Sequence, residues 1–219
     1  MIAPRRVFAG ALSLAGLAAL AFFAPPPLIG EALAQNATAA LVAKPVSLPD
    51  MALGSANAPV IIVEYASMSC PHCAAFHENV FPMLQSKYVD AGKVRFVFRE
   101  FPLDIKAAAA SMLARCVAGV DAAKYFATIE RLFKQQDQLM EQTKDTLNLI
   151  GNQFGMDEQA VEACEKDQAR LDKLKADQTF AFEVLKVDAT PTFFINGERA
   201  KGAMSFEELE AKIKPLLKK

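Results

Sequence analysis

The sequence contains no tryptophan, only two histidines and only four cysteines in 219 residues. Such scarcity leaves few ligands for a structural zinc ion, which is usually held by four side chains of these two kinds. Basic and acidic residues number 24 and 25, and the absence of a basic stripe argues against nucleic-acid binding. Apolar residues make up 53% of the chain, so a full core can form without disulfides, and the cysteines need another explanation.

The first residues have the layout of an export signal. A short positive segment precedes the apolar run 7–24, three prolines follow, and Ala32 and Ala34 then occupy the small-x-small positions that a signal peptidase prefers. We therefore expect a signal peptide over residues 1–34, cleaved near Ala34, and an extended leader over residues 35–59. A retained anchor is the alternative, because the run is close to the ~18-residue lower limit for a membrane span.

Hydrophobic patterning predicts the order of strands and helices that follows the leader. Residues 60–66 form a β-rich apolar run that is typical of a buried central strand, and residues 94–101 predict a second strand. Between them an amphipathic helix begins at Pro71, and Pro82 is expected to kink it. We therefore expect strand, helix and strand in this order, with Cys70 at the start of the helix.

The C-terminal part predicts a β-hairpin followed by a helix. Residues 192–195 predict a strand, and an Asn-Gly turn separates it from a return strand at 198–202. Ser205 and Glu208 form a capping box for the last helix. Residues 104–186 predict only helices, too many for one crossover, which indicates a helical subdomain inserted into an α/β frame. The expected helices span residues 106–118, 122–134, 143–154, 158–166 and 169–186.

Two of the cysteines lie in the sequence Cys70-Pro71-His72-Cys73. If Cys70 is the N-cap residue of the helix, Pro71 stands at the first helical position, where proline is favoured. The backbone N–H groups of the next two residues then face the Cys70 sulfur, and both the helix dipole and a protonated His72 favour its thiolate. Such sites lower a cysteine pKa by roughly one to five units. We therefore expect Cys70 to be the reactive thiol and the more buried Cys73 to resolve its mixed disulfides.

Three other interpretations of this segment are weaker. Haem attachment requires histidine directly after the second cysteine, and Ala74 stands there instead. Metal binding through Cys70, Cys73 and His77, which share one helical face, lacks an evident fourth ligand. An inert cysteine pair would not need the Pro-His spacer. His77 itself is expected to be an ordinary helix residue.

These motifs together resemble the DsbA-like thiol:disulfide oxidoreductases of the bacterial periplasm. The resemblance rests on the strand before the Cys-Pro-His-Cys helix, the helical insertion and the later segment VDATPTFFING, and it covers nearly all of residues 60–217. It implies an α/β protein with a thioredoxin fold over residues 60–103 and 187–219. The inserted all-helical subdomain is then expected over residues 104–186.

The resemblance also implies roles for residues around the cysteines. Thr190–Pro191 is expected to be a cis peptide bond packed against the Cys70–Cys73 disulfide, with the Thr190 backbone free to pair with an extended substrate. Glu64 matches an acid that in relatives lies beneath the resolving cysteine and exchanges protons with it; a salt-bridged structural acid is the alternative. The best-known family oxidase has valine before this proline. Threonine there also occurs in disulfide isomerases, which leaves the balance between the two activities open.

The activity that the resemblance implies is that of a protein disulfide oxidase. Such an enzyme would donate the Cys70–Cys73 disulfide to unfolded or reduced exported proteins through a mixed disulfide. A DsbB-type membrane quinone reductase is expected to restore the disulfide, with no flavin, nicotinamide or metal cofactor, and the protein is expected to be a periplasmic monomer. A disulfide isomerase or reductase on the same fold is the main alternative, and a periplasmic metal-binding module is a further one.

The two remaining cysteines, Cys116 and Cys164, stand on predicted helices of the insertion, and neither has a close-spaced partner. Two free thiols in one small subdomain are not expected in an oxidising compartment, so we predict a structural disulfide between them. The alternative is a pair of unpaired core cysteines. Many relatives lack a second pair, so this prediction rests on the residues and on export, not on the resemblance.

Overall fold

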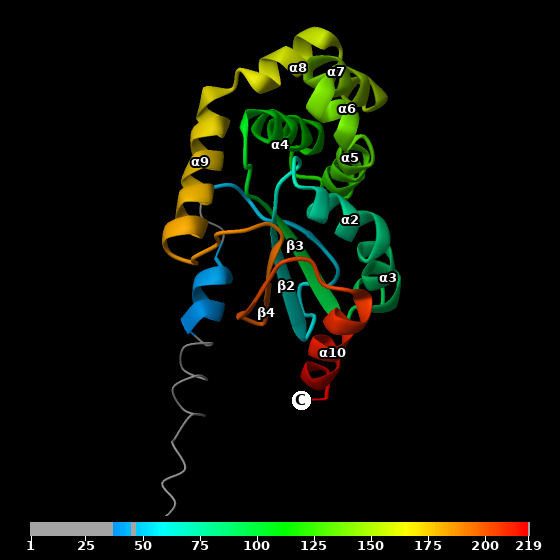
Figure 1. The fold of residues 1–219 in the computed structure, drawn as a ribbon, viewed down its shortest axis with the longest axis vertical. Helices are drawn as coiled ribbons and strands as arrows, with labels where there is room; N and C mark the ends of the chain where they lie inside the picture. Colours follow the sequence, from blue (N-terminus) through cyan, green and yellow to red (C-terminus); the bar gives the residue numbers. More distant parts are fainter. Residues whose placement is uncertain (1–36, 45–46, 219) are drawn as a thin grey trace, which may run out of the picture.

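A five-stranded mixed sheet lies at the centre of the computed structural model, which describes residues 37–44 and 47–218 (Figure 1). The strands lie in the order β1-β3-β2-β4-β5, in which β2 and β3 are parallel and the other neighbouring pairs are antiparallel. Their bounds are Met51–Leu53 (β1), Val60–Ala66 (β2), Val94–Glu100 (β3), Thr192–Ile195 (β4) and Glu198–Lys201 (β5). The predicted signal segment and its cleavage position near Ala34 lie outside the described residues.

Strand β2 is buried because helices cover both faces of the sheet. Ile62 belongs to the core that contains Phe76 of helix α2 (Pro71–Asn79), whereas Val63 belongs to a second core that contains Ala181 of helix α9 (Gln168–Glu183). Burial on both sides explains why the strand is apolar almost throughout. The one carboxylate of this strand, Glu64, is fully buried, where an uncompensated charge is costly.

Four residues separate the end of β2 from the start of α2, and the helix breaks near Pro82. Its hydrogen bonds end at Val80, and the chain continues as a short helix, Phe81–Leu84 (α3), and a π-helical turn, Gln85–Val89 (η1). Proline has no N–H with which to continue the α2 ladder, so the break falls where the sequence predicts a kink. The break leaves α2 short and its first turn directly at the carboxyl end of β2.

The inserted subdomain consists of helices throughout. Figure 1 shows α4 to α8 gathered over one end of the sheet, with α9 running back beside it. Helix α6 is missing from the sequence-based assignment because six residues are too few to reveal a period. Aspartates at the N-caps of α4, α5, α8 and α9 accept backbone N–H bonds and define where these helices begin. The bounds are Ile105–Ala118 (α4), Ala122–Lys134 (α5), Gln136–Glu141 (α6), Thr143–Gln153 (α7), Glu158–Glu165 (α8) and, as given above, Gln168–Glu183 (α9).

The C-terminal hairpin and helix follow the predicted pattern. Asn196 and Gly197 both have positive φ, at 45° and 84°, which is the backbone of a tight turn between β4 and β5. Gly197 is also required by space, since a Cβ there would lie 2.5 Å from the Cβ of Ala39. Helix α10 (Phe206–Leu216) begins with a complete capping box made by Ser205 and Glu208.

The prediction of an extended leader over residues 35–59 is wrong in part. Residues 37–42 are helical, and β1 adds to the edge of the sheet, where Met51 pairs with Phe98. The prolines and the lack of periodicity in this segment favoured extended chain. Tertiary contacts decide otherwise, because Val42 is buried in the core beneath α9 and Met51 is 2% exposed.

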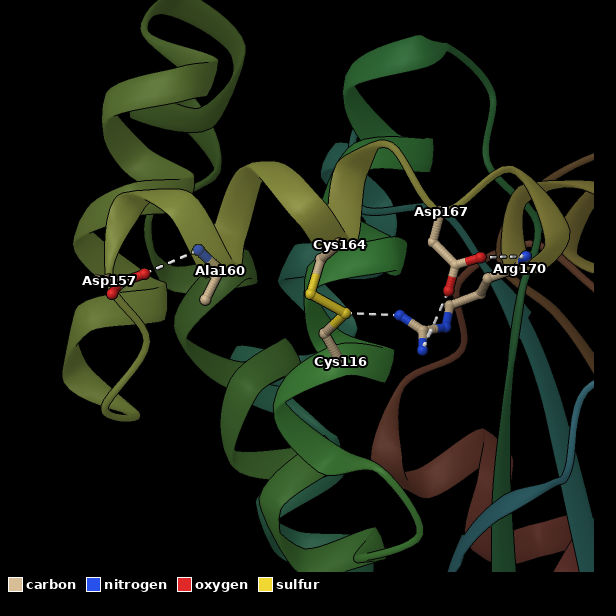
Figure 2. Close-up of a disulfide and its surroundings, with 6 residues drawn as sticks. All are labelled: Cys116, Asp157, Ala160, Cys164, Asp167 and Arg170. Carbon is tan, nitrogen blue, oxygen red and sulfur yellow. Dashed lines mark hydrogen bonds and ion pairs between the residues drawn. A yellow bond between two sulfur atoms is a disulfide. The ribbon is translucent and has the colours of Figure 1, made fainter.

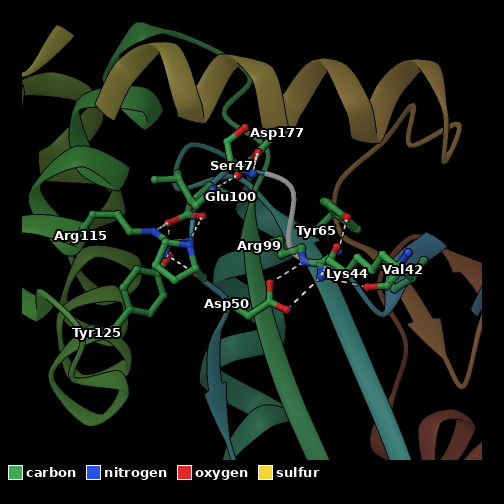
Figure 3. A network of polar contacts seen from close by, with 12 residues as sticks. Val42, Lys44, Ser47, Asp50, Tyr65, Arg99, Glu100, Arg115, Tyr125 and Asp177 are labelled. Atoms are coloured by element: carbon green, nitrogen blue, oxygen red, sulfur yellow. Dashed lines mark hydrogen bonds and ion pairs between the residues drawn. The ribbon is translucent and has the colours of Figure 1, made fainter. Parts of the chain in front are cut away.

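A buried arginine on β3 holds the leader in place (Figure 3). Arg99 donates to both carboxylate oxygens of Asp50, to the hydroxyl of Tyr65, and to the backbone carbonyls of Val42 and Lys44, over 2.8–3.2 Å. These bonds satisfy the guanidinium group, which a buried charge requires. Arg99 therefore adds side-chain hydrogen bonds to the backbone pairing of β1 with β3 in attaching the leader to the sheet.

A second arginine ties the insertion to the same strand (Figure 3). Arg115 of α4 forms a bidentate ion pair with Glu100, whose Oε1 also accepts the hydroxyl of Tyr125 of α5. Asp177 of α9 accepts the backbone N–H groups of residues 47 and 48. Sheet, leader and insertion thus meet in one polar network and form a continuous body around the end of β3.

The disulfide between Cys116 and Cys164 joins α4 to α8 (Figure 2). Their Cα atoms lie 6.1 Å apart, within the range of unstrained bridges. The guanidinium group of Arg170, at the start of α9, donates to the Cys116 sulfur. This is the pair that the sequence analysis predicts, and it closes a large part of the insertion into a loop.

Candidate active site

The geometry of the Cys-Pro-His-Cys segment follows from the way α2 begins. Cys70 is the N-cap residue, with φ −87° and ψ 117°, and Pro71 follows it at the first helical position. One turn later, Cys73 points into the core and is fully buried, whereas Cys70 is 5% exposed. Both are present as free thiols. Of the two sulfurs, the one on Cys70 is therefore the one that solvent can approach.

The site lowers the pKa of Cys70 to about 5. The largest cause is a hydrogen bond from the Cys73 thiol, which stabilises the thiolate against the opposing effect of burial. A hydrogen bond with Thr190 and the backbone N–H groups of Cys73 and His72 act in the same direction. At neutral pH Cys70 is accordingly a thiolate, the form that takes part in thiol–disulfide exchange.

The pKa of Cys73 shifts the opposite way. Burial raises it far above the ordinary value, and the hydrogen bond that it gives to Cys70 adds to this effect. The negative charge of Glu64 raises it further, while a backbone hydrogen bond from Ser67 opposes the shift weakly. Cys73 therefore holds its proton while Cys70 is ionised.

Thr190 packs directly against the reactive sulfur. The Cys70 thiol donates to the Thr190 carbonyl at 3.3 Å, and the peptide bond between Thr190 and the buried Pro191 is cis. The Thr190 hydroxyl is buried and has no hydrogen-bond partner among the described residues while Cys70 is a thiol. Thr190 lowers the pKa of Cys70 because its hydroxyl can donate a hydrogen bond to the Cys70 thiolate.

Glu64 and His77 form a buried pair beneath the cysteines. Glu64 Oε2 lies 2.7 Å from His77 Nε2, and the two side chains are 0% and 3% exposed. The expectation that His77 is an ordinary helix residue is therefore wrong. Its position on the buried face of α2, opposite β2, brings it to the carboxylate, and the sequence offers no signal for this pairing beyond an acid in an apolar strand and a histidine on the next helix.

Gln136 is a residue of the site that sequence reasoning missed. It lies on α6, is 9% exposed, and its side-chain amide donates to the carbonyls of Met68 and Cys70 at 2.8 and 3.1 Å. These bonds fix the loop between β2 and α2 from the side of the insertion. A glutamine in a short polar helix has no sequence pattern that reveals such a contact.

The remaining predicted residues lie apart from the cysteine sulfurs. His72 is exposed, and its backbone N–H is the group that acts on Cys70. His77 bonds to Glu64 and not to the cysteines with which it shares a helical face. Within residues 37–44 and 47–218, no group of three or more His, Cys, Asp or Glu side chains is placed to hold a metal ion.

Comparison with known proteins places these features in a family. Residues 47–215 match the thioredoxin family. "Disulfide bond formation protein D" of Bacillus subtilis is 30% identical over 176 residues, which cover 76% of each chain. A Rickettsia bellii protein named "Putative protein-disulfide oxidoreductase" is 35% identical over 150 residues, 68% of this chain. Those residues span only 57% of the Rickettsia protein.

The fold comparison agrees with the sequence comparison. The crystal structure of alpha-DsbA1 of Wolbachia pipientis superposes with a TM-score of 0.72 at 32% identity. The superposition covers 78% of this chain and 92% of that one. The α/β fold with its helical insertion, and the resemblance drawn from the cysteine and proline motifs, are thereby confirmed. The chain belongs to the thioredoxin family, as a DsbA-like member.

Proposed function

We propose that this protein is a thiol:disulfide oxidoreductase that donates a Cys70–Cys73 disulfide to other proteins. The observation that carries the proposal is the opposite shift in pKa of two thiols one helical turn apart, of which the one with the lowered pKa, Cys70, is 5% exposed and the other, Cys73, is fully buried. Whatever stabilises the Cys70 thiolate also stabilises the dithiol form. A disulfide between these residues is then readily reduced, which makes it a strong oxidant of other thiols.

Disulfide donation proceeds through Cys70. A substrate thiolate attacks the Cys70 sulfur of the disulfide, the bond to Cys73 breaks, and Cys73 leaves with the electron pair and takes up a proton. A second substrate thiolate then attacks the substrate sulfur of the mixed disulfide. Cys70 leaves as a thiolate, which its surroundings stabilise, and the substrate is released with a disulfide.

We assign the neighbouring residues to positioning and proton exchange. Pro71 and the N–H groups of His72 and Cys73 present the first turn of α2 to the Cys70 sulfur. Glu64 lies where a carboxyl group can exchange a proton with Cys73, on which its charge acts. The backbone of Thr190, next to Pro191, borders the reactive sulfur and offers an edge for an extended substrate chain.

We place the protein in the periplasm as a monomer, with unfolded or reduced exported proteins as substrates. An oxidase must be reoxidised, and a DsbB-type membrane quinone reductase is the partner that we propose. The predicted signal segment supports export. In the described part of the chain, no helix is both long and apolar enough to span a bilayer.

A disulfide isomerase or reductase is the second candidate, because threonine before this proline, here Thr190, also occurs in the disulfide isomerases that the chain resembles. A buried hydroxyl beside the reactive sulfur changes how strongly the thiolate is held, and therefore changes the redox equilibrium. An isomerase acts as a dithiol, whereas an oxidase acts as a disulfide. The redox form in which the protein is active, dithiol or disulfide, therefore distinguishes the two activities.

The test uses a reduced peptide with two cysteines and a protein with scrambled disulfides. As an oxidase, the disulfide form converts the peptide to its disulfide with one equivalent consumed, while the dithiol form leaves the scrambled protein largely unchanged. In Cys73→Ser, the Cys70 thiolate attacks a disulfide of the scrambled protein, one substrate thiolate leaves, and the protein is retained as a mixed disulfide on Cys70; Cys70→Ser, its matched control, retains none. A dithiol form that unscrambles disulfides while the disulfide form transfers nothing would identify an isomerase.

A further inference from the structure

A groove separates the active-site helix from the inserted subdomain. It lies between α2–α3 and the start of η1 on one side and α5 on the other, and its volume is about 380 Å³ (Figure 1). Pockets of this size bind ligands in other proteins, usually through apolar side chains and a few polar groups. We call this feature the α2–α5 groove.

The α2–α5 groove has an apolar floor. Phe81 and Phe126 line it, each 7% exposed, and their rings stack with centroids 5.9 Å apart and planes 11° apart. On α5, Ala123 and Ala127 stand one turn apart and carry only methyl groups, so this face of the helix leaves space unfilled. Apolar side chains of another molecule gain free energy by leaving water for such a space.

Both walls of the groove meet at the active site. Ala74 of α2 lines a small extension of the groove beside His77, and its N–H donates to the carbonyl of Cys70 at 3.1 Å. On the other wall α5 ends at Lys134, and Gln136, two residues later, donates to the same carbonyl at 3.1 Å. One end of the groove is therefore next to the residue that forms mixed disulfides.

The groove is long enough for a short stretch of extended polypeptide. Its lining residues on α5 run from Ala123 to Lys134 within one continuous helix. At 1.5 Å per residue this distance is about 16 Å. An extended chain advances about 3.3 Å per residue, so about five residues span the groove.

Charged residues at the rim favour one kind of occupant. Glu78 and Glu130 contribute two carboxylates, and Lys134 contributes one ammonium group, which lies 2.6 Å from Glu130. Glu78 is exposed and forms no ion pair with residues 37–44 or 47–218. The rim therefore carries a net negative charge, which complements a basic side chain.

We propose that the α2–α5 groove binds the polypeptide substrate on one side of its reacting cysteine and prefers a segment with apolar residues and a lysine or arginine. The proposal rests on the function proposed above and adds a substrate preference to it. The Thr190 carbonyl borders the Cys70 sulfur, so the groove holds a second part of a chain that already contacts this backbone. The apolar floor takes the apolar side chains, and Glu78 pairs with the basic one.

The first experiment compares three reduced peptides that share the same pair of cysteines. Their five-residue flanks are apolar with one lysine, apolar with one glutamate, or serine and glycine only. The rate of disulfide transfer from the wild-type protein is measured at low peptide concentration, where it reports kcat/KM. Each rate is divided by the rate at which the same peptide reduces a small aromatic disulfide, because a nearby charge also shifts the thiol pKa.

We expect the lysine peptide to react at least about threefold faster than either of the other two at low ionic strength, an effect typical of exposed charge pairs. Its advantage over the glutamate peptide should shrink as salt is added. Equal corrected rates for the three peptides would overturn the groove as a substrate site.

Two substitutions separate the charge of the rim from the space above the floor. Glu78→Lys should reverse the preference between the lysine and glutamate peptides. Glu183→Lys, the same charge change at an exposed position at the end of α9, should keep the wild-type preference. Ala127→Leu fills the groove and should bring the rates of the lysine peptide and the serine–glycine peptide together. Each result is a ratio within one variant, so a loss of folded protein does not alter it.

A mixed disulfide shows directly where the peptide lies. In Cys73→Ser, the Cys70 thiolate attacks the cysteine sulfur of a peptide joined to thionitrobenzoate, which leaves as a thiolate, and the peptide stays bonded to Cys70. For the lysine peptide we expect nuclear Overhauser contacts with the methyl groups of Ala123 and Ala127.

Two results would reject the groove while leaving the proposed function intact. One is a bonded peptide that makes no contact with these methyl groups, and the other is the same peptide preference in wild type and Glu78→Lys. A wild-type disulfide form that oxidises none of the three peptides would instead refute the proposed function.

Discussion

At the scale of single residues, the chemistry of the site comes from unequal surroundings of two identical side chains. Cys70 stands at the end of a helix, where N–H groups and the Cys73 thiol meet its sulfur, and its pKa falls to about 5. Cys73, three positions later, faces the core and the charge of Glu64, and its pKa rises. One helical turn separates the partly accessible Cys70 from the fully buried Cys73, so the spacing of the pair also assigns the roles.

The Thr190 hydroxyl is expected to contribute to the low pKa of Cys70. Thr190→Val keeps the shape of the side chain and the carbonyl that contacts the sulfur, but removes a hydrogen bond that the thiolate would accept. We expect the Cys70 pKa to rise by about one unit, which corresponds to about 1.4 kcal/mol. Because the dithiol form loses this stabilisation, the disulfide should also become a weaker oxidant.

The measurement for this variant is a titration of thiolate absorbance, since the chain has no tryptophan to report the redox state by fluorescence. Thr192→Val is the control, because the Thr192 hydroxyl is bonded to the carbonyl of Ala189 and not to the sulfur. If Cys70 titrates in Thr190→Val as it does in wild type, the Thr190 hydroxyl does not contribute to the low pKa of Cys70.

At the scale of elements, the short helix α6 is expected to stabilise the loop that carries Cys70. Gln136→Leu would leave the carbonyls of Met68 and Cys70 without their side-chain donor. We expect the free energy of unfolding to fall by about 1–3 kcal/mol, the usual effect of unsatisfied buried groups. We also expect the rate of Cys70 alkylation to change, because the N-cap loses one of its supports.

Urea unfolding and rapid-quench alkylation test the two effects of this substitution. Gln138→Leu on the same helix is the control, since Gln138 is exposed. If both variants unfold at the same urea concentration and react with iodoacetamide at the same rate, α6 does not support the active-site loop.

The bridge between α4 and α8 is expected to stabilise the insertion without taking part in the chemistry. It links residues 48 positions apart, so in the loop-entropy account its removal costs roughly 4 kcal/mol. Cys116→Ala/Cys164→Ala should therefore melt well below wild type yet still oxidise the dithiol peptide. Thermal unfolding followed by circular dichroism, together with the peptide assay, measures both. Unchanged melting would mean that the polar network around β3 holds the insertion by itself.

At the scale of the whole molecule, the ionisation of Cys70 links redox state to stability and pH. Its folded pKa of about 5 lies below the unfolded value of roughly 8.5, so the ionised group stabilises the dithiol fold. That contribution is fully present above the unfolded pKa and is lost as pH falls towards 5. Between pH 5 and 8 the free energy of unfolding of the dithiol form should rise, relative to the disulfide form, by at most about 1.4 kcal/mol per pH unit, less with solvent screening.

Urea unfolding of both redox forms across this pH range measures the difference. The disulfide form is the internal control, because neither Cys70 nor Cys73 can ionise in it, and Cys70→Ser in its reduced state should lose the dependence. Parallel pH profiles for the two wild-type forms would show that the Cys70 thiolate is not stabilised by the fold.

Much of the molecule was predictable because it depends on neighbouring residues. The strands 60–66 and 192–195, the start of α2 at Pro71 and the capping box at Ser205 follow from hydrophobic period, proline geometry and side-chain caps. The position of Cys70 at a helix N-terminus follows from the same local rules. These features need no knowledge of what the finished elements touch.

Only the tertiary structure decided which buried polar groups meet. Periodicity marks the face of α2 that is buried, but the pairing of His77 with Glu64 depends on how that helix packs on β2. In the same way Arg99 reaches carbonyls of the leader, and Gln136 reaches the active-site loop across 66 residues of sequence. A buried charge or amide must find a partner wherever the packed chain offers one, and the sequence records the need for that partner without recording its position.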